Sequence, residues 1–532
     1  MEEAEQTNRS RGVTQRALAS QQATRPRVSL LRYSPALVLL ASATLDMYRF
    51  ADPDLWWHVM SGRMMLTTWH FTAFDPFSYS APNHIWLHHE WLSELIEAWI
   101  FTHFGVLGIK LLKFVCSAAV VSFLVLAIGE TGAPVTIQLG VTLASVFAIV
   151  LEMQYRPQMF SFVMFAGLLW MLTRANYRRR APLWIAVPIL AIWSNLHGGF
   201  ILGVFALATY AAVIGIQDFV ASRGLQRGLI LSSIAMLGLA ASLANPIGLE
   251  SWRAIIIVFK EPLTSQVIAD WRPLFFRLTT TPVATLIGLY FWYFAALILV
   301  AAILFATVPV FDDLPLVAIA ALMILAAFSA TRNISFAAIA VAPPLAHRLA
   351  ILMRRYRDLD ADPYSARRGF ANEAVAFGIA AAIAFSTGLF SGRLRDASST
   401  PSGAVAFMQS RGLHGNILND FGWGYYLIWH TAPANKVFID TRYNFVYPHD
   451  VIADYVSFQS GDPESAAILK KYPHDYVLIN VKCGAFDLMM HQADWQLIYR
   501  DPEAALFARA DSPAAKIAGI PVQGNPATDY FP

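Results

Sequence analysis

Cysteine and charged residues are both scarce in this chain of 532 residues. Its two cysteines, Cys116 and Cys483, lie in an apolar run and in the C-terminal segment, which argues against a disulfide framework or a cysteine-based metal site. Only 14% of the residues are charged and 56% are hydrophobic, whereas soluble proteins carry about 25% charged residues. This composition, concentrated in long apolar runs, excludes a soluble enzyme and a nucleic-acid-binding protein. It predicts a polytopic membrane protein.

We expect no cleavable signal peptide at the start of this sequence, and no internal repeat stands out in it. The first 28 residues are polar, whereas a signal peptide has its apolar core near the start. We therefore expect residues 1–32 to form a disordered cytoplasmic tail. Apolar runs long enough to cross about 30 Å of hydrocarbon follow this tail and predict about eleven spans. The predicted spans are residues 33–50, 108–128, 134–151, 157–173, 181–194, 198–217, 228–244, 283–308, 314–330, 334–353 and 373–391.

The basic loops fall on one side of these spans, which the positive-inside rule makes the cytoplasmic side. This assignment requires the run 92–107, which contains Glu94, Glu97 and His103, to lie in the interface as an amphipathic helix. The other polar loops then share the opposite side, so we expect one external site built from several of them. These loops are residues 51–107, 152–157, 194–200, 245–282 and 331–335, together with everything after about residue 392.

The C-terminal segment changes character and is typical of a water-soluble α/β module. The expected strands are residues 417–421, 436–440, 475–480, 496–499 and 505–508, and the expected helices are residues 404–409 and 462–471. The predicted fold class is therefore mainly α, a polytopic helical membrane bundle with a small external α/β domain. The predicted domains are the tail 1–32, a transmembrane domain 33–392 with a large first external loop 51–107, and an external domain 393–532.

Two carboxylates, two indoles and an imidazole occur within residues 52–58, directly after the first apolar run. A carboxylate beside hydrocarbon needs water, a partner or a metal. One interpretation is structural: an aspartate caps the next helix and the tryptophans join an interfacial belt. A second polar and aromatic cluster, at residues 86–91, is not explained by a cap. The two clusters together favour a site at the membrane surface.

Two kinds of metal site are open from the residue types. Imidazoles with a carboxylate could bind zinc, although their spacing here matches no compact zinc motif. The residues concerned are His58, His84, His88, His89 and Glu90. Separately, Asp52 or Asp54 together with Glu152 would suit Mg²⁺ or Mn²⁺, which could clamp a diphosphate.

Three arginines are candidates for binding a phosphate on the external side, because the guanidinium fork matches phosphate oxygens. These are Arg156, Arg272 and Arg332. The alternative is that each one snorkels or pairs with a nearby acid, Arg156 with Glu152 and Arg272 with Asp270. A further candidate is the turn at residues 195–199, where Asn195 and His197 precede two glycines. Its exposed amides could bind an anion, or it could be a tight turn capped by the asparagine.

The topology and two motifs resemble the GT-C glycosyltransferases, multi-span enzymes that use polyprenyl-phosphate- or polyprenyl-diphosphate-linked sugars. Asp54-Leu-Trp-Trp-His58 resembles the first-loop motif of the oligosaccharyltransferase catalytic subunits. Asn419-Asp-Phe-Gly-Trp-Gly-Tyr-Tyr426 resembles their Trp-Trp-Asp-Tyr-Gly region but lacks its central acid, so recognition of a peptide sequon is not implied. The combined pattern resembles an uncharacterised bacterial branch, which implies a multi-pass protein of the inner membrane with a cytoplasmic N-terminus and a periplasmic C-terminal domain.

This resemblance implies transfer of a sugar from a polyprenyl-linked donor to a hydroxyl of a glycan, lipid or protein acceptor, with inversion. Asp54, aided by Asp52, is the expected general base. The expected phosphate-binding residues are Arg332, Arg156, Arg272, His197 and Asn195. The expected acceptor or loop cluster comprises His58, His88, His89, Glu90, Trp57, Asp420, Trp423 and Tyr425.

Two other functions remain open. A transporter or flippase for a lipid-linked glycan should show repeated halves and charged residues in mid-span, and neither pattern stands out in the sequence. A non-catalytic scaffold with the same frame is favoured by the missing acid beside Phe421 and by the single acid, Glu152, in the second external loop.

Overall fold

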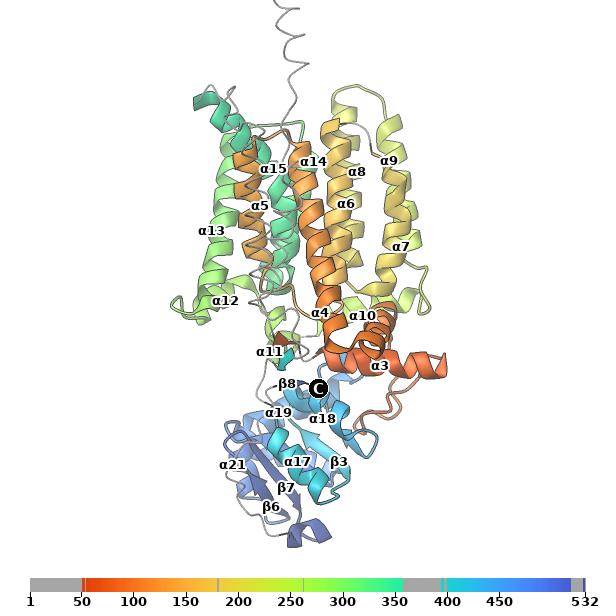
Figure 1. Ribbon diagram of the computed structural model, residues 1–532, viewed down its shortest axis with the longest axis vertical. Helices are drawn as coiled ribbons and strands as arrows, with labels where there is room; N and C mark the ends of the chain where they lie inside the picture. Colours follow the sequence, from red (N-terminus) through yellow and green to blue (C-terminus); the bar gives the residue numbers. More distant parts are fainter. Residues whose placement is uncertain are drawn as a thin grey trace, which may run out of the picture.

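The computed structural model describes residues 50–52, 54–178, 181–261, 263–356, 394–396, 400–517 and 530–531. The predicted tail 1–32, nearly all of the span 33–50 and the span 373–391 lie outside the described residues. A bundle of helices stands on a smaller α/β layer, and α3 (Asp54–Thr68) lies between the two (Figure 1). The limits 33–392 and 393–532 of the predicted domains stay predictions, because the described residues break off between 356 and 394.

The bundle is built from apolar helices that follow the predicted runs. Five are long and apolar enough to cross a membrane: α4 (Trp91–Glu130), α6 (Gln158–Arg178), α8 (Phe200–Val220), α13 (Leu286–Thr307) and α15 (Ile334–Tyr356). Four others are apolar but shorter: α5 (Val135–Ile149), α7 (Ala186–Leu196), α9 (Gln226–Ala241) and α14 (Leu314–Ser329). The mainly helical class is confirmed, but the total of about eleven spans is not.

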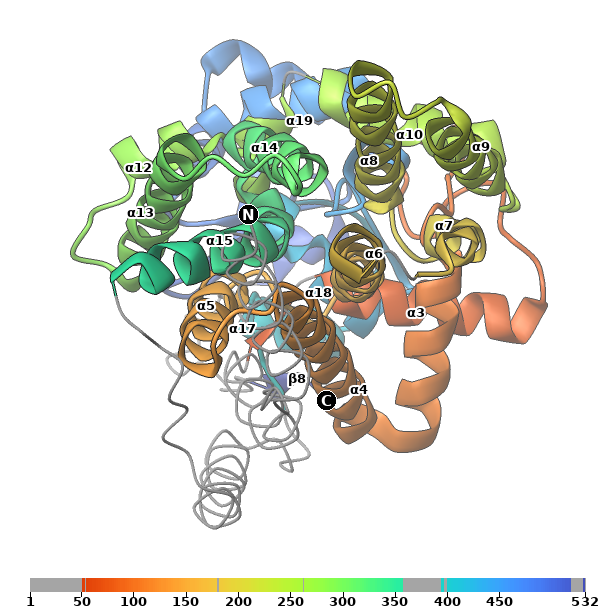
Figure 2. The same ribbon diagram turned by 90° about the horizontal axis from the view of Figure 1, so that it is seen from above.

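Helix α4 is broken at Gly105, whose φ of 60° and ψ of −152° form a conformation that glycine adopts readily and other residues do not. The break separates the more polar part, which includes Glu94 and Glu97, from the apolar part that joins the bundle. The first part lies across the end of the bundle beside α3, as Figures 1 and 2 show. The interfacial interpretation of the run 92–107 agrees with this arrangement. Short helices cover the same end: α10 (Leu249–Lys260), α11 (Thr264–Val267) and α12 (Leu274–Thr280).

The C-terminal layer contains a five-stranded mixed sheet in the order β4-β3-β5-β7-β6. Its central strand, β5 (Tyr476–Asn480), pairs in parallel with β3 (Gly415–Asn419) and antiparallel with β7 (Ala504–Arg509). The edge strands are β4 (Asn435–Val437) and β6 (Trp495–Arg500). These strands and the β6–β7 hairpin confirm the sequence prediction, as does α17 (Ser402–Ser410). The sequence analysis missed three helices: α18 (Gly424–Thr431), α19 (His449–Ser460) and α21 (Gly484–Met490).

The first loop, residues 51–107, packs against this sheet and is hydrogen-bonded to its edge strand. The backbone N–H of Val437 in β4 donates to the carbonyl of Phe77 at 3.0 Å, and the N–H of Tyr79 donates back to Val437 at 3.2 Å. Residues 77–79 therefore form an isolated parallel β-bridge, between Ser78 and Val437, at the edge of the sheet, which covers backbone groups that an edge would otherwise expose. A second small sheet joins β1 (Phe50–Ala51), β2 (Leu394–Asp396) and β8 (Tyr530–Phe531), so three distant segments meet just before α3.

A buried guanidinium fastens the same loop to the C-terminal layer. The side chain of Arg442 is 1% exposed and pairs with both Asp75 of the loop and Asp440 beyond β4. Both pairs are bidentate, the geometry that holds carboxylates most firmly. The indole of Trp86 lies 4.8 Å from the guanidinium carbon, and the Tyr447 hydroxyl donates to Asp440 at 2.6 Å.

Replacing Arg442 with methionine should destabilise the closed loop, because it leaves two buried carboxylates without their cation. Breaking one side of a buried ion pair costs about 3–5 kcal/mol. Thermal unfolding of the detergent-solubilised protein, combined with limited proteolysis within residues 69–90, would measure the effect. Arg411→Met, which removes an exposed arginine after α17, is the matched control. Equal melting temperatures for the two variants would contradict this account.

Candidate functional site

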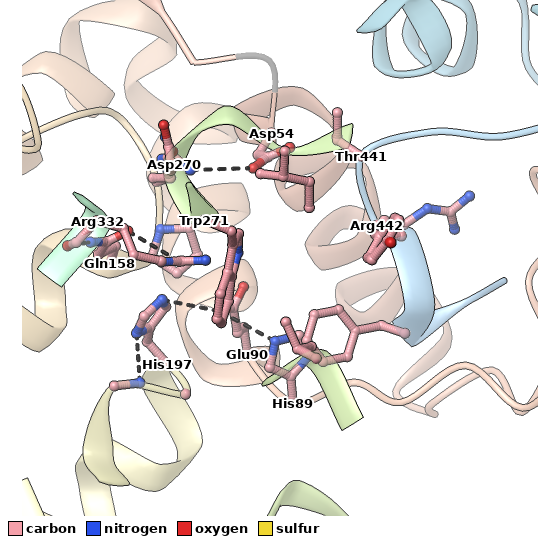
Figure 3. Close-up of a pocket in the computed structure, with 18 of the residues that line it drawn as sticks. Asp54, His89, Glu90, Gln158, His197, Asp270, Trp271, Arg332, Thr441 and Arg442 are labelled. Carbon is pink, nitrogen blue, oxygen red and sulfur yellow. Dashed lines mark hydrogen bonds and ion pairs between the residues drawn. The ribbon is translucent and has the colours of Figure 1, made fainter. Parts of the chain in front are cut away.

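A cavity of about 320 Å³ lies between the bundle and the C-terminal layer. One wall comes from the start of α3 and from the loop before α4, and the opposite wall from the loops before α6, α8 and α15. The C-terminal layer supplies Phe421 and residues 441–445. Figure 3 shows charged and aromatic side chains from these elements turned toward one another. The prediction of one site shared by several loops therefore matches the geometry of this cavity.

Arg156, just before α6, is the centre of the acidic side of the cavity. Its Nη2 lies 3.0 Å from Oδ2 of Asp52 and 2.8 Å from Oδ2 of Asp270, and its Nη1 lies 3.8 Å from Oδ2 of Asp54. Burial opposes ionisation of Asp270, but the charges of Arg156 and Arg332 lower its pKa. The sequence analysis named Asp270 only as a partner for Arg272 and did not place it in the site.

The two aspartates of the first motif have different surroundings. Asp52 accepts the backbone N–H of Asp54 at 3.0 Å, so the capping interpretation describes Asp52. Burial raises the pKa of Asp52 to about 7, although the charge of Arg156 opposes this shift. Asp54 accepts the indole N–H of Trp57 at 3.2 Å and is the more exposed aspartate, with 22% of its side chain accessible against 7% for Asp52. Asp54 is therefore the carboxylate of the pair that an incoming group can reach.

The three predicted phosphate-binding arginines are not equivalent. Arg332 lines the cavity, lies over the Trp271 ring at 4.8 Å and donates to Oε1 of Gln158 at 3.2 Å. In the described part of the chain no carboxylate lies within ion-pair distance of it, so its charge is available to an anion. Arg272 instead donates to the carbonyl oxygens of Ser265 and Gln266 and lies outside the cavity lining.

Three imidazoles converge on the carboxylate of Glu90. The Nε2 atoms of His89, His197 and His58 lie 3.4, 3.5 and 3.6 Å from its oxygens. Burial raises the pKa of Glu90, but the neighbouring histidines, His89 first, outweigh burial and hold that pKa low. His89 also stacks on Phe445 with ring centroids 3.7 Å apart. His88 lies outside the cavity lining, with its Nε2 3.1 Å from the carbonyl of Thr72.

The turn at residues 195–199 supports this cluster. Nδ1 of His197 accepts the backbone N–H of Gly199 at 2.9 Å, which leaves Nε2 to donate toward Glu90. Burial lowers the pKa of His197 to about 3, in keeping with a neutral ring. Asn195 accepts the indole N–H of Trp91 at 2.8 Å. The Gly199 amide is therefore engaged within the protein, and the turn orients His197.

Neither predicted metal site fits the described geometry. Within residues 54–178 and the other described segments, no group of three or more His, Cys, Asp or Glu side chains is arranged to hold a metal ion. The guanidinium of Arg156 stands between the carboxylates of Asp52, Asp54 and Asp270, where a cation would sit. Glu152 is absent from the cavity lining, and the histidine Nε2 atoms already face Glu90.

The second motif, residues 419–426, packs within the C-terminal layer. Trp423 is 3% exposed and Tyr425 is fully buried, and both belong to its apolar core. Asp420 caps a short 3₁₀ helix (Phe421–Trp423) by accepting the N–H of Gly422, and it also accepts the Gln459 amide. These three residues were expected near the acceptor, but of the motif it is Phe421 that reaches the cavity.

The stability of the site should depend on pH through His58. Burial alone would lower the pKa of His58, but its hydrogen bond to Glu94 and the charges of Glu90 and Glu97 raise that pKa from 6.5 to about 9. A histidine whose pKa is raised by folding contributes stability that is complete below its unfolded pKa and is lost as the pH rises through the folded pKa.

The melting temperature of the wild-type protein should therefore fall between pH 6.5 and pH 9, and His58→Gln should flatten this fall. His414→Gln, which removes an exposed histidine, is the control. Parallel curves for His58→Gln and wild type would show that the buried imidazole carries no such charge.

Two solved structures share the arrangement of most of this chain. The oligosaccharyltransferase AglB from Archaeoglobus fulgidus, in complex with an inhibitory peptide and a dolichol-phosphate, superposes with a TM-score of 0.53 at 12% identity, over 85% of this chain and 69% of that one. The arabinofuranosyltransferase AftD from Mycobacteria superposes with a TM-score of 0.52 at 14% identity, over 90% of this chain and 42% of AftD. No family model and no curated protein matches the sequence. The chain has the fold of the GT-C membrane glycosyltransferases.

Proposed function

We propose that the protein is a membrane glycosyltransferase that moves a sugar from a polyprenyl-phosphate or polyprenyl-diphosphate donor to an acceptor hydroxyl. The observation that carries this proposal is one cavity, in a GT-C fold, that holds both the accessible carboxylate of Asp54 and the charge of Arg332. The AglB structure was solved with a dolichol-phosphate, a lipid of the proposed donor class. We place the protein in a bacterial inner membrane, with the cavity and the C-terminal layer on the periplasmic side.

The cavity lining suits a phosphate attached to a long apolar chain. Arg332 offers a guanidinium held in place by Trp271 and Gln158, and such a fork matches phosphate oxygens. Apolar side chains line the same cavity beside these groups: Ile201, Leu202, Ile255, Val258 and Phe336. A polyprenyl chain could lie against them while its phosphate faces Arg332.

In the proposed reaction Asp54 takes the proton from the acceptor hydroxyl as general base. The acceptor oxygen then forms a bond to the anomeric carbon, and the bond between that carbon and the phosphate oxygen breaks with inversion. The electron pair leaves with the phosphate, whose charge Arg332 stabilises. The guanidinium of Arg156 holds the carboxylates of Asp52 and Asp54 in position. In this proposal Asp54 is the base and Asp52 supports it.

Asp54→Asn should abolish transfer while leaving expression and membrane insertion intact, because the amide keeps the shape of the side chain and loses its basicity. Transfer of sugar from extracted lipid-linked donors by membranes containing each variant is the measurement. Asp487→Asn, on the exposed face of α21, is the control. Full activity of Asp54→Asn would exclude this base. Failure of the wild-type protein with every donor pool would exclude the transferase and favour the scaffold.

Arg332→Gln should lower kcat by about 10² to 10³, the usual cost of removing one donor that stabilises transition-state charge. Arg253→Gln, on the exposed face of α10, should leave kcat unchanged. Initial rates at saturating acceptor would compare the two variants. An equal loss in both would mean that Arg332 has no special part in holding the phosphate.

A further inference from the structure

The loop before α6 places a permanent cation where the sequence predicted a divalent metal. Arg156 lies between Asp52, Asp54 and Asp270, and each of these carboxylates has an oxygen within 3.8 Å of a guanidinium nitrogen. Figure 3 shows the Asp54 carboxylate turned toward Asp270. Carboxylate oxygens are the ligands that Mg²⁺ and Mn²⁺ prefer. The chain therefore gathers metal-binding groups but fills the space between them with its own side chain.

Arg156 is fixed in this position. Its Nη2 also donates to Oε1 of Gln154 at 2.7 Å, and 14% of its side chain is accessible. A guanidinium in a protein is always protonated, so a divalent ion that approached the same carboxylates would meet a fixed positive charge. In the described segments no three metal-binding side chains converge closely enough to hold an ion. A metal could enter this position only after the guanidinium had been removed.

Among the described residues that line the cavity, one cation is left for a ligand. The guanidinium of Arg442 is paired with Asp75 and Asp440. The imidazoles beside Glu90 face its carboxylate. Arg332 instead lies over an indole ring and donates to an amide oxygen, so its charge is not spent on a carboxylate. The cavity thus offers a single guanidinium to an incoming anion.

This charge pattern distinguishes two classes of lipid-linked sugar. A sugar joined to its carrier through one phosphate is a phosphodiester with one negative charge, whereas a diphosphate link carries two. Arg332 compensates the first charge. A second charge would lie in the same cavity as the net acidic set around Arg156, and juxtaposed like charges are unfavourable. A divalent ion bound to the carboxylates would remove this repulsion, but the guanidinium holds its position.

We propose that Arg156 takes the place of a divalent metal in this site, and that the donor is therefore a sugar linked to its polyprenyl carrier through a single phosphate. The inference rests on the proposed transferase function and specifies its donor and its independence of metal. Arg156 is a positioning residue: it compensates the carboxylates and orients Asp54. Arg332 is the residue that meets the phosphate.

Titration with Mn²⁺, followed by electron paramagnetic resonance of the free ion, tests the first part on the full-length protein in non-ionic detergent. Arg156→Ser should bind Mn²⁺ about tenfold or more tightly than wild type, because buried carboxylates lose their cation. Adding Asp270→Asn should weaken this binding again. Arg253→Ser, which frees Glu250 on α10, is the matched control. Equal binding by Arg156→Ser and Arg253→Ser, or wild-type binding that Asp54→Asn abolishes, would overturn the inference.

Donor binding in the presence of EDTA tests the second part on the wild-type protein alone, so it does not depend on the folding of any variant. In lipid nanodiscs we expect a hexose linked to the carrier through one phosphate to bind about tenfold or more tightly than the same hexose linked through a diphosphate. Equal or tighter binding of the diphosphate, or binding that requires Mn²⁺, would overturn the inference.

Transfer assays separate this inference from the proposed function. Transfer confined to diphosphate-linked donors would overturn the single-phosphate assignment and leave the transferase standing. Selective binding of the single-phosphate lipid by a wild-type protein that transfers no sugar would support the inference about the site and overturn the transferase.

Discussion

The enclosure of the cavity depends on one buried guanidinium. Arg442 joins Asp75, in the loop that follows α3, to Asp440, beyond the end of β4. Without this cation, closing the loop would bury the carboxylate of Asp75 with no cationic partner, which is unfavourable by several kcal/mol. Because the pair is satisfied, residues 77–79 can lie along the sheet edge and residues 441–445 can face the membrane helices. The two ion pairs of Arg442 thus hold the cavity wall of the C-terminal layer against the wall formed by the helical bundle.

The charged groups of the cavity are arranged in sets that come from distant parts of the chain. Arg156 collects the carboxylates of Asp52, Asp54 and Asp270, and Glu90 collects three imidazoles. The Arg156 set has one cation for three carboxylates and is net acidic, which agrees with the raised pKa of the buried Asp52. Arg332 lacks such a carboxylate partner within the described residues, and this difference makes it the natural place for an incoming anion.

Local pattern predicted much of this structure. The apolar runs follow from their length and composition, the helix start near Asp54 from its capping aspartates, and the strands of the C-terminal layer from short strand-forming segments. The motif at residues 52–58, Arg156, Arg332, Glu90 and two of its three histidine partners were named as site candidates from residue types and line the cavity, whereas His197 was expected to bind phosphate and not to face Glu90. Asp270 was missed because its place beside the cavity depends on its contact with Arg156, which is distant in the sequence. Trp423 and Tyr425 were misplaced because an aromatic motif looks alike in a core and in a site.

The pairing of the first loop with the C-terminal layer has a consequence for synthesis in the cell. Asp75 and Arg442 are 367 residues apart, so the loop is made long before its partner. At the usual speed of the ribosome, about 5–20 residues per second, the delay is about 20–70 s. During that interval the loop segment 69–85, with the exposed side chains of Trp69, Phe71 and Ile85, has no sheet to join. Newly made protein therefore passes through an open form for this interval, and that is the stage at which proteases and chaperones would meet the unpaired loop.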